Sequence, residues 1–516
     1  MLDKYPQPVG ALKISEVARG SPYTIDMTSA TEMLDLTRLD QTVLRVYVRQ
    51  LLIFPFPDAA LRKHAGAVLA AGLLAAFKQF PFLAGTVEQT DPAVGAMAVR
   101  YPKIIDSQLV SKLLTTNTLD NEELDYDTLH QAGIPPVGLP ADDLCPFAMR
   151  SHPGIDDTYA EVLTTFTKGQ PIPVFAAQMN FIPGGLILSV YTHHSVIDGT
   201  GVAKIYQVWS GNTRKNNSGL AILKQVSACA LNNARHALDT LVEGAPTMDL
   251  PDYRFPGDPT PPLLRDAPVK LSAKLLVLSP STISTLAASL SARTGQRIST
   301  FTALASFVWC QATNARRAAI MSKGIEKTTL GIATDHRKRV GSLIPDDYLG
   351  NVANAMTVSV PLSSIPTSET MNAEGIAPVA LALSNALARV DLDWFRARLL
   401  EISKQKNPSK LMMNCHTMNG PDIFITSWQH IGADEIWAIP GTARTDAGNG
   451  CEQAWGCKPT AVRKPHNMWE GGMQILPRRK GNEAPYEIPL CLEEGDMERV
   501  LRSLQEGEWM ERVIEA

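Results

Sequence analysis

The chain has 516 residues, of which 45% are hydrophobic and 19% are charged, and 48 basic and 52 acidic side chains give it a formal net charge of −4. This length is enough for two domains that each bury a core. The near balance of charges argues against a nucleic-acid partner, which would need a basic face.

Targeting and membrane signals are not expected. The N-terminus lacks the basic-then-apolar layout of a signal peptide, and the longest apolar run, 65–77, is too short to span a bilayer and predicts a buried helix. The seven cysteines are scattered and show no C-x-x-C spacing, which is typical of free thiols in a reducing compartment. We therefore expect a cytoplasmic protein without a disulfide framework or a zinc site.

The first elements of the chain are expected to alternate between strand and helix. Alternation over 46–53 predicts a strand, and helical spacing over 61–80 predicts a helix that stops before Pro81. Residues 174–182 alternate as another strand, and an apolar run over 185–190 follows a Pro-Gly turn. The last two segments predict a β-hairpin.

The hairpin leads into the sequence Tyr-Thr-His-His-Ser-Val-Ile-Asp-Gly-Thr-Gly over 191–201, after which 202–209 has helical periodicity. His193 and His194 are thus expected at a corner between a strand and a helix. A histidine at the end of a buried strand has a fixed backbone, which a general base requires. A histidine pair alone at such a place is more often structural than catalytic. The whole pattern H-H-x-x-x-D-G-x-G favours catalysis.

The residues after the histidines are expected to shape the corner. Asp198 is too far along the turn to be presumed the partner of an imidazole, so we expect it to tie the corner together through a buried ion pair. Gly199 and Gly201 allow backbone torsions that are closed to other residues.

The middle of the chain predicts a connection between domains. A helical segment, 222–241, precedes a proline-rich stretch over 249–269 that breaks both hydrophobic periodicities. We therefore expect an N-terminal domain over 1–220, a helical and proline-rich crossover over 221–270, and a C-terminal domain over 271–516.

The C-terminal domain is also expected to mix strands and helices. The predicted strands are 273–278, 328–334, 423–428 and 487–492, and the predicted helices are 283–292, 299–309 and 496–504. The strand over 328–334 runs into Asp-His-Arg-Lys-Arg, and two arginines at i and i+2 on an extended segment point to the same face. Taken alone, charged side chains at the end of a strand favour a position in solvent.

Three motifs in this order resemble the BAHD acyltransferases of the chloramphenicol-acetyltransferase-like superfamily: H-H-x-x-x-D-G at 193–199, Y-x-G-N at 348–351 and W-G-x-K-P at 455–459. The resemblance runs from about residue 36 to 504 and looks closest to fungal trichothecene 3-O-acetyltransferase-like tailoring enzymes. It implies an α/β fold of two chloramphenicol-acetyltransferase-like domains, with mixed sheets flanked by helices and a channel between the domains.

The resemblance also implies roles for the residues of the corner. In that family the second histidine of the pair is the general base and the aspartate is structural. Carried over by position, His194 is the base, His193 supports it, and Asp198 and Gly199 are structural.

In the same family one arginine of an R-x-R sequence pairs with the structural aspartate. This implies a pair between Asp198 and either Arg337 or Arg339, and the sequence leaves the choice open. Tyr348 and Asn351 follow in step and are expected to support the site.

The strand end Thr426-Ser427-Trp428 is expected, by the resemblance, to line the channel opposite the base. A hydroxyl there could hydrogen-bond the oxyanion of a tetrahedral intermediate. Which of the two hydroxyls faces inward is open. On the residues alone, the segment indicates only β-propensity and packing.

The second signature of the family, D-F-G-W-G, is altered in this chain. The aligned segment is Glu452-Gln453-Ala454-Trp455-Gly456, so only Trp455 and Gly456 are kept. The resemblance assigns this segment a structural role away from the base, so catalysis is expected to survive the change. The preceding segment, 441–450, is expected to be an insertion.

The resemblance implies an acyl-CoA-dependent O-acyltransferase that moves an acyl group, with acetyl favoured, to a hydroxyl of a terpenoid, polyketide or alkaloid. Acyl-CoA is expected as a co-substrate, with no permanently bound cofactor, no metal and no partner chain, so the enzyme would be a monomer. Activity should fall below about pH 6.5, where imidazole is protonated, unless the pocket shifts its pKa. The alternatives are a condensation enzyme that uses a carrier-protein-bound donor, a cyclisation enzyme, and a catalytically silent binding protein.

Overall fold

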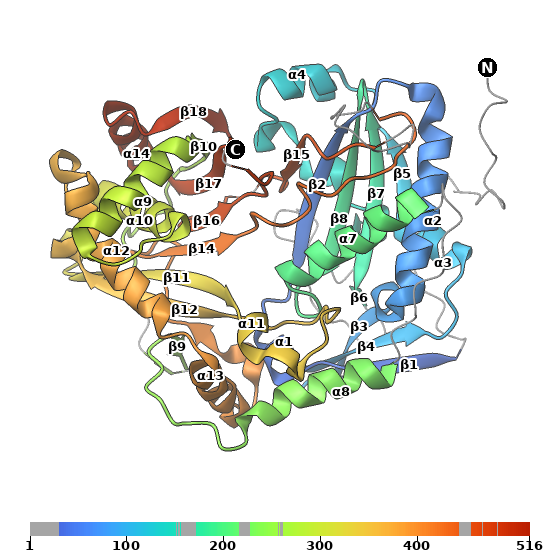
Figure 1. The fold of residues 1–516 in the computed structure, drawn as a ribbon, viewed down its shortest axis with the longest axis horizontal. Coiled ribbons are helices and arrows are strands. Elements are labelled where there is room, and N and C mark those ends of the chain that lie inside the picture. Colours follow the sequence, from blue (N-terminus) through green and yellow to red (C-terminus); the bar gives the residue numbers. More distant parts are fainter. Residues whose placement is uncertain are drawn as a thin grey trace. The chain divides into compact units, whose positions relative to one another are not determined.

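The computed structural model describes residues 30–150, 152, 155, 172–215, 228–255, 257–258, 262–442, 456–466, 468–481 and 483–516 (Figure 1). The chain divides into two compact units. The first unit comprises Met1–His236, Pro345–Asn351 and Ile431–His466, and the second comprises Ala237–Ile344, Val352–His430 and Asn467–Ala516.

This division differs from the domain bounds expected from the sequence. The segments Pro345–Asn351 and Ile431–His466 were expected in the C-terminal domain but belong to the first unit. For the second of them, β15 (Ala461–Arg463) pairs antiparallel with β2 (Tyr47–Pro55), so that Ala461 lies opposite Ile53. Hydropathy patterns do not show which distant strand completes the edge of a sheet.

The first unit has two sheets and eight α-helices among its described residues, counting α8, which crosses its boundary. In addition to β2 and β15, its elements are β1 (Thr31–Asp35), α1 (Arg38–Thr42), α2 (Arg62–Gln79), β3 (Thr86–Asp91), β4 (Ala96–Pro102), α3 (Ser107–Leu113), β5 (Leu114–Thr118), α4 (Tyr126–Gln131), α5 (Ala141–Leu144), α6 (Phe147–Arg150), β6 (Ile172–Pro173), β7 (Phe175–Ile182), β8 (Gly185–His193), α7 (Gly199–Lys215) and α8 (Ala228–Asp239).

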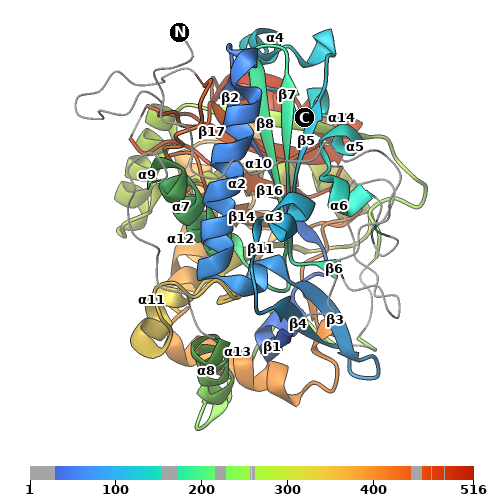
Figure 2. The ribbon, with the colours of Figure 1, turned by 90° about the vertical axis from the view of Figure 1, so that its right-hand side faces the viewer.

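The larger sheet of the first unit has the strand order β15-β2-β8-β7-β5, and the smaller has the order β1-β4-β3-β6. The helices α2 and α7 pack against one face of the larger sheet (Figures 1 and 2). Phe175 on β7 contacts the rings of Phe77 on α2 and Trp209 on α7, and the Trp209 indole donates to the Leu69 carbonyl at 2.9 Å. Both faces of β8 are buried, which fixes the strand that ends at His193 and leads into His194.

The predicted hairpin is confirmed. β7 and β8 pair antiparallel from Phe175 opposite Thr192 to Ile182 opposite Gly185. The turn contains Gly184 with φ of 67°, a left-handed value that glycine adopts without strain.

One helical segment of the described residues, Ala59–Gln79, is long and apolar enough to cross a membrane by length and composition alone. A bent pair of helices, α12 (Ala373–Ala388) with α13 (Leu392–Lys404), meets the same criterion as a unit. Half of the apolar window of Ala59–Gln79 is buried inside the protein. Leu69 and Leu73 on α2 are fully buried, as expected for a core helix.

The second unit is built on a seven-stranded sheet in the order β12-β11-β14-β16-β17-β10-β18, with a short ribbon of β9 and β13. Its elements are β9 (Tyr253–Arg254), β10 (Leu271–Leu278), α9 (Pro280–Thr294), α10 (Thr300–Ser322), β11 (Lys327–Asp335), α11 (Arg337–Val340), β12 (Ala353–Pro361), α12 (Ala373–Ala388), α13 (Leu392–Lys404), β13 (Met412–Met413), β14 (Ile423–Ser427), β16 (Gly472–Ile475), β17 (Tyr486–Glu493), α14 (Glu494–Glu506) and β18 (Met510–Glu515).

The main core of the second unit lies between this sheet and the helices α9, α10, α12 and α14 (Figure 1). Ile423 and Ile425 of β14 point into this core and are fully buried. The predicted strands and helices of the C-terminal half all occur. The strand β18 at the sheet edge was not predicted. The mixed sheets flanked by helices confirm the expected fold class.

Candidate active site

The backbone of the histidine corner is held by neighbouring strands. The amide of His193 donates to the Val174 carbonyl at 2.8 Å, and the amide of His194 donates to the Val46 carbonyl at 2.9 Å. The amides of Val196 and Ile197 then turn back onto the His193 carbonyl. The corner is therefore an extension of the sheet rather than a free loop.

His193 is a core residue. Its side chain is fully buried, and its ring packs edge-on against Tyr47 at 5.4 Å between centroids. Burial, with smaller effects from His194 and Arg45, lowers the pKa of His193 to about 3. A ring that is buried and neutral over the physiological range supports the corner and does not exchange protons with a substrate.

His194 follows the last residue of β8 and is half-buried. Its Nδ1 is enclosed and makes no hydrogen bond within the described residues, although the carbonyls of His194 itself and of Ile197 lie near enough to favour a proton on the ring. Nε2 is not enclosed in this way and makes no hydrogen bond to a described residue. Nε2 is thus the nitrogen available to a substrate.

Burial lowers the pKa of His194, and this effect outweighs the opposing influence of the two carbonyls and of the Asp198 carboxylate. The ring therefore stays neutral to lower pH than a free histidine does. A neutral imidazole with an accessible lone pair is the form in which a general base acts.

Asp198 directly precedes the helix α7. Its side chain is 2% exposed, its Oδ1 accepts from the Gly201 amide at 2.9 Å, and its carbonyl accepts from the Val202 amide at 2.9 Å. This is an N-cap arrangement, in which an aspartate satisfies an amide that the helix leaves unpaired. These bonds of Asp198 fix the end of the corner. Its pairing with Arg337 or Arg339 stays a prediction.

The segment Pro345–Asn351 lies against this corner. The Asn351 side-chain amide donates to the His194 carbonyl at 3.0 Å and to Oδ1 of Asp40 at 2.8 Å. The Asn351 backbone amide also donates to Asp40, at 3.1 Å. Asn351 therefore connects the candidate base to a residue more than 300 positions earlier in the chain.

The rest of this segment packs without spare room. The Tyr348 hydroxyl accepts from Arg235 at 3.0 Å, and the guanidinium lies over the tyrosine ring. A Cβ on Gly350 would come within 2.6 Å of both side chains. A Cβ on Gly201 would collide with the Leu349 carbonyl oxygen. Two glycines are thus required for the segment to reach the corner.

The arrangement of the two arginines corrects the expectation of an extended segment. Arg337 and Arg339 lie in the helical turn α11, where positions i and i+2 do not share a face. Arg337 pairs with the Asp335 carboxylate at 3.1 Å, whereas Arg339 donates to the carbonyls of Val390 and Asp335. The turn forms because the Asp335 carboxylate accepts from the Arg337 amide and folds the chain as β11 ends.

His336 anchors this turn. Its ring is fully buried and stacks on Phe395 at 4.2 Å and on Trp394 at 5.5 Å, and its Nε2 shares a hydrogen bond of 2.7 Å with Asn354. Burial lowers the pKa of His336 to about 4. The position of α11 is therefore set by aromatic packing.

The end of β14 distinguishes the two candidate hydroxyls within the second unit. Ser427 has the same strand parity as Ile423 and Ile425, which point toward the helices. Thr426 has the parity of Phe424, whose ring contacts Trp469. Ser427 is exposed and accepts from Gln429, while Thr426 and Trp428 are partly buried. Thr426 is therefore the hydroxyl on the face opposite the main core of the second unit.

The altered signature is only partly described. The structure does not describe residues 451–455, which include Trp455. Most of the expected insertion, 443–450, also lies outside the described residues. Gly456 precedes Cys457, which forms an antiparallel bridge with Trp437, and Lys458 pairs with Asp434 at 3.3 Å. This part of the segment is thus fixed within the first unit.

Two family models match the chain. The trichothecene 3-O-acetyltransferase-like N-terminal domain matches residues 46–212, and the model of the Transferase family matches residues 153–504, which is more than half of the chain. The chain belongs to the Transferase family. The prediction of a BAHD-type acyltransferase is thereby confirmed.

Relatives in this Transferase family match almost the whole chain. A trichothecene 8-O-acetyltransferase of Fusarium sporotrichioides is 26% identical over 506 residues, covering 90% of this chain and 94% of its own length. The O-acetyltransferase ptmV of Penicillium ochrochloron is 24% identical over 520 residues, covering 91% and 95%.

A solved structure shows the same fold. The crystal structure of F. graminearum TRI101 complexed with coenzyme A and T-2 mycotoxin aligns with a TM-score of 0.71 at 19% identity, covering 94% of this chain and all of that chain.

Most predicted site residues of the first unit come together in this Transferase-family chain: His193, His194, Asp198, Gly199, Tyr348 and Asn351. Asp40 was missed. The chain held a signal for it in Thr37-x-x-Asp40, the spacing of a capping box, and Thr37 and Asp40 do form one at the start of α1. The described residues contain no cluster of three or more histidine, cysteine or acidic side chains that could hold a metal ion.

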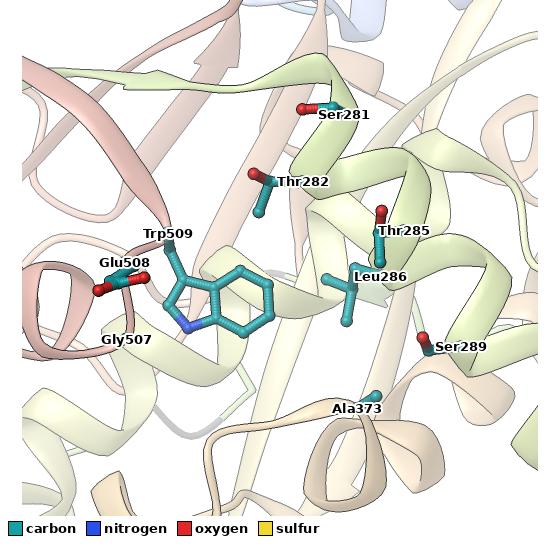
Figure 3. Close-up of a pocket in the computed structure, with 9 residues that line it drawn as sticks. All are labelled: Ser281, Thr282, Thr285, Leu286, Ser289, Ala373, Gly507, Glu508 and Trp509. Atoms are coloured by element: carbon teal, nitrogen blue, oxygen red, sulfur yellow. The ribbon is translucent and has the colours of Figure 1, made fainter.

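A pocket of about 400 Å³ lies elsewhere, on the surface of the second unit (Figure 3). It is lined by α9 residues, among them Thr282, Thr285 and Ser289, and by Trp509 after α14. None of the predicted site residues lines it.

Proposed function

We propose that this chain transfers an acyl group, with acetyl favoured, from acyl-CoA to a hydroxyl group of a small secondary metabolite, with His194 as the general base. The observation that carries the proposal is the state of His194. Its backbone is fixed at the end of β8, its Nε2 is open to a substrate, and burial lowers its pKa so that the lone pair is free near neutral pH.

In the proposed reaction, Nε2 of His194 takes the proton of the acceptor hydroxyl while the acceptor oxygen attacks the carbonyl carbon of the thioester. The tetrahedral intermediate then collapses as the carbon–sulfur bond breaks. The proton on Nε2 passes to the departing CoA thiolate, which leaves an ester and free CoA. Both substrates meet at one base, so no covalent acyl-enzyme is needed, and much of the rate comes from proximity.

Thr426 is proposed as the hydroxyl that stabilises the oxyanion, because it lies on the face of its sheet opposite the main core, while Ser427 has the parity of the core residues Ile423 and Ile425. Removal of one such donor typically costs roughly 100- to 1,000-fold in kcat. Acetyl donors and hydroxylated terpenoid acceptors are favoured because the relatives are named as trichothecene and other O-acetyltransferases.

The test is thiol release from acetyl-CoA in the presence of a panel of trichothecenes, other terpenoids, polyketides and alkaloids, with the acetylated product identified by mass spectrometry. Wild type is compared with His194→Ala at equal folded fraction. Release that needs both the acceptor and His194 supports the proposal. Product formation without release of CoA would instead favour a cyclisation or carrier-protein reaction, and full activity of His194→Ala would overturn the role of the base.

A further inference from the structure

Asp40 is a buried carboxylate that is paired with amides and not with a cation. Its side chain is fully buried, and no described lysine, arginine or histidine forms an ion pair with it. Its Oδ2 accepts from the Thr37 amide at 2.8 Å, and its Oδ1 accepts from both amides of Asn351. A buried carboxylate is costly unless donors replace its water, and three N–H groups do so here.

Asn351 has one possible orientation in this network. Its Nδ2 lies 2.8 Å from Oδ1 of Asp40 and 3.0 Å from the His194 carbonyl oxygen, and both partners are acceptors. The side-chain NH2 group must therefore face both, and it uses one hydrogen for each. A hydrogen bond to a charged carboxylate is stronger than a neutral one, so Asp40 holds this amide in place.

The His194 carbonyl joins the network to the candidate base. It accepts from Asn351 and also lies close to the imidazole of its own residue. The His194 amide is fixed on the other side by Val46 at 2.9 Å. The peptide groups on both sides of the His194 Cα are thus held by partners distant in sequence, and together they set the direction in which the ring leaves the backbone.

We infer that Asp40 is a positioning residue for acyl transfer. It holds the Asn351 side chain, which fixes the His194 carbonyl and thereby the direction in which Nε2 points. This inference rests on the proposed role of His194 and adds a chain of two hydrogen bonds that starts outside the histidine motif. An error of about 1 Å in the placement of a reacting group can lower a rate roughly 100-fold.

The experiment uses two single variants and their combination in the full-length chain. Asp40→Asn removes the charge that orients Asn351, and Asn351→Asp replaces the donor to the His194 carbonyl by an acceptor. In the double variant the new amide at position 40 can donate to the new carboxylate at position 351, but that carboxylate cannot donate to the His194 carbonyl. Stability should therefore recover in part relative to Asn351→Asp, while kcat should not.

The expected result is a fall in kcat of roughly 10- to 100-fold for Asp40→Asn, with the KM for acetyl-CoA changed less than about threefold. The matched control is Thr37→Val, which removes the hydroxyl partner of the Asp40 amide but leaves the bonds between Asp40 and Asn351. It should lower the melting temperature and leave kcat near the wild-type value.

Two outcomes would overturn the inference. Either Asp40→Asn has the wild-type kcat at equal folded fraction, or the double variant regains kcat together with stability, which would make the network purely structural. His194→Ala in the same assay separates this failure from that of the proposed function. If His194→Ala is inactive and Asp40→Asn is normal, only the positioning role is wrong, whereas an active His194→Ala removes both.

Discussion

The two histidine corners of this chain, at His194 and at His336, both lie between a strand and a helix, but the ring is exposed to different surroundings at each. Each histidine directly follows a strand, β8 or β11, and precedes a helix, α7 or α11. At His194 the backbone is held by hydrogen bonds and Nε2 is open. At His336 the ring itself is held between two aromatic rings and hydrogen-bonded to Asn354.

The difference comes from segments that are far away in sequence. Asn351 reaches the first corner and leaves its ring available, whereas Phe395 of α13 covers the ring at the second. A histidine directly after a strand therefore predicts where the ring is attached to the backbone. It does not predict whether the ring is available to a substrate or is packed into the core. The comparison can be tested by changing the two residues in parallel.

The largest effect is expected on activity. His194→Gln should lower kcat at least roughly 100-fold, because glutamine keeps a polar group but has no basic nitrogen. His336→Gln should leave kcat within a few-fold of wild type when rates are corrected for the folded fraction. Thiol release under saturating substrates measures both, and equal losses in the two variants would contradict the contrast.

The next effect is on stability. His336→Ala should lower the free energy of unfolding by about 3 kcal/mol, since it leaves a cavity between Phe395 and Trp394. His430→Ala, at an exposed histidine of the second unit, is the control and should change stability by less than about 0.5 kcal/mol. Urea denaturation followed by circular dichroism gives both values. A loss at His430 as large as that at His336 would count against the packing argument.

The third effect is on the dependence of stability on pH and builds up gradually with each pH unit. The pKa of His336 is about 4 in the folded chain and near 6.5 in the unfolded chain, so between these values only the unfolded chain takes up a proton there. The site then costs about 1.4 kcal/mol of stability for each pH unit below 6.5, down to about pH 4. Asp422, whose pKa burial raises to about 6, acts in the opposite direction.

The measurement is the unfolding free energy of wild type and of His336→Asn at several pH values. Both proteins contain Asp422, so its contribution cancels when one free energy is subtracted from the other. A difference that does not change with pH would contradict the pKa of His336.

At the other corner, burial lowers the pKa of His194, so the acid limb of the kcat profile should lie below pH 6.5. An acid limb above that value would show that the ring is less desolvated.

The smallest effects are expected from two glycines of α7. Gly201→Ala should destabilise by about 1 to 3 kcal/mol, because the new methyl group would meet the Leu349 carbonyl and, at 2.7 Å, the Ile197 side chain. Gly211→Ala adds a methyl group whose nearest neighbour is the tip of Arg214 at 3.8 Å, and should stabilise the helix by about 0.5 to 1 kcal/mol. Melting temperatures that shift in the same direction would contradict the close packing at Gly201.

Periodicity and motif spacing were sufficient for most of the secondary structure and for the histidine corner. They predicted the β7–β8 hairpin and α2, because those elements carry their pattern in consecutive residues. They did not predict that Arg337 and Arg339 lie on a helical turn, since the cause is a side-chain cap from Asp335 and the stacking of His336. They also missed Asp40, whose role depends on contact with Asn351, and contacts of that kind leave no local pattern.

The pairing of β15 with β2 has a consequence for how the protein is made. β2 and β8 leave the ribosome early, as parts of the N-terminal segment of the first unit, which ends at residue 236. The strand that covers the outer edge of β2 is β15, and it ends only at residue 463. At roughly 5 to 20 residues per second, the nascent chain exposes that edge for roughly 10 to 45 s. An uncovered edge strand invites pairing with other chains. The yield of soluble protein should therefore depend on translation speed and chaperone supply more than the compactness of the finished fold suggests.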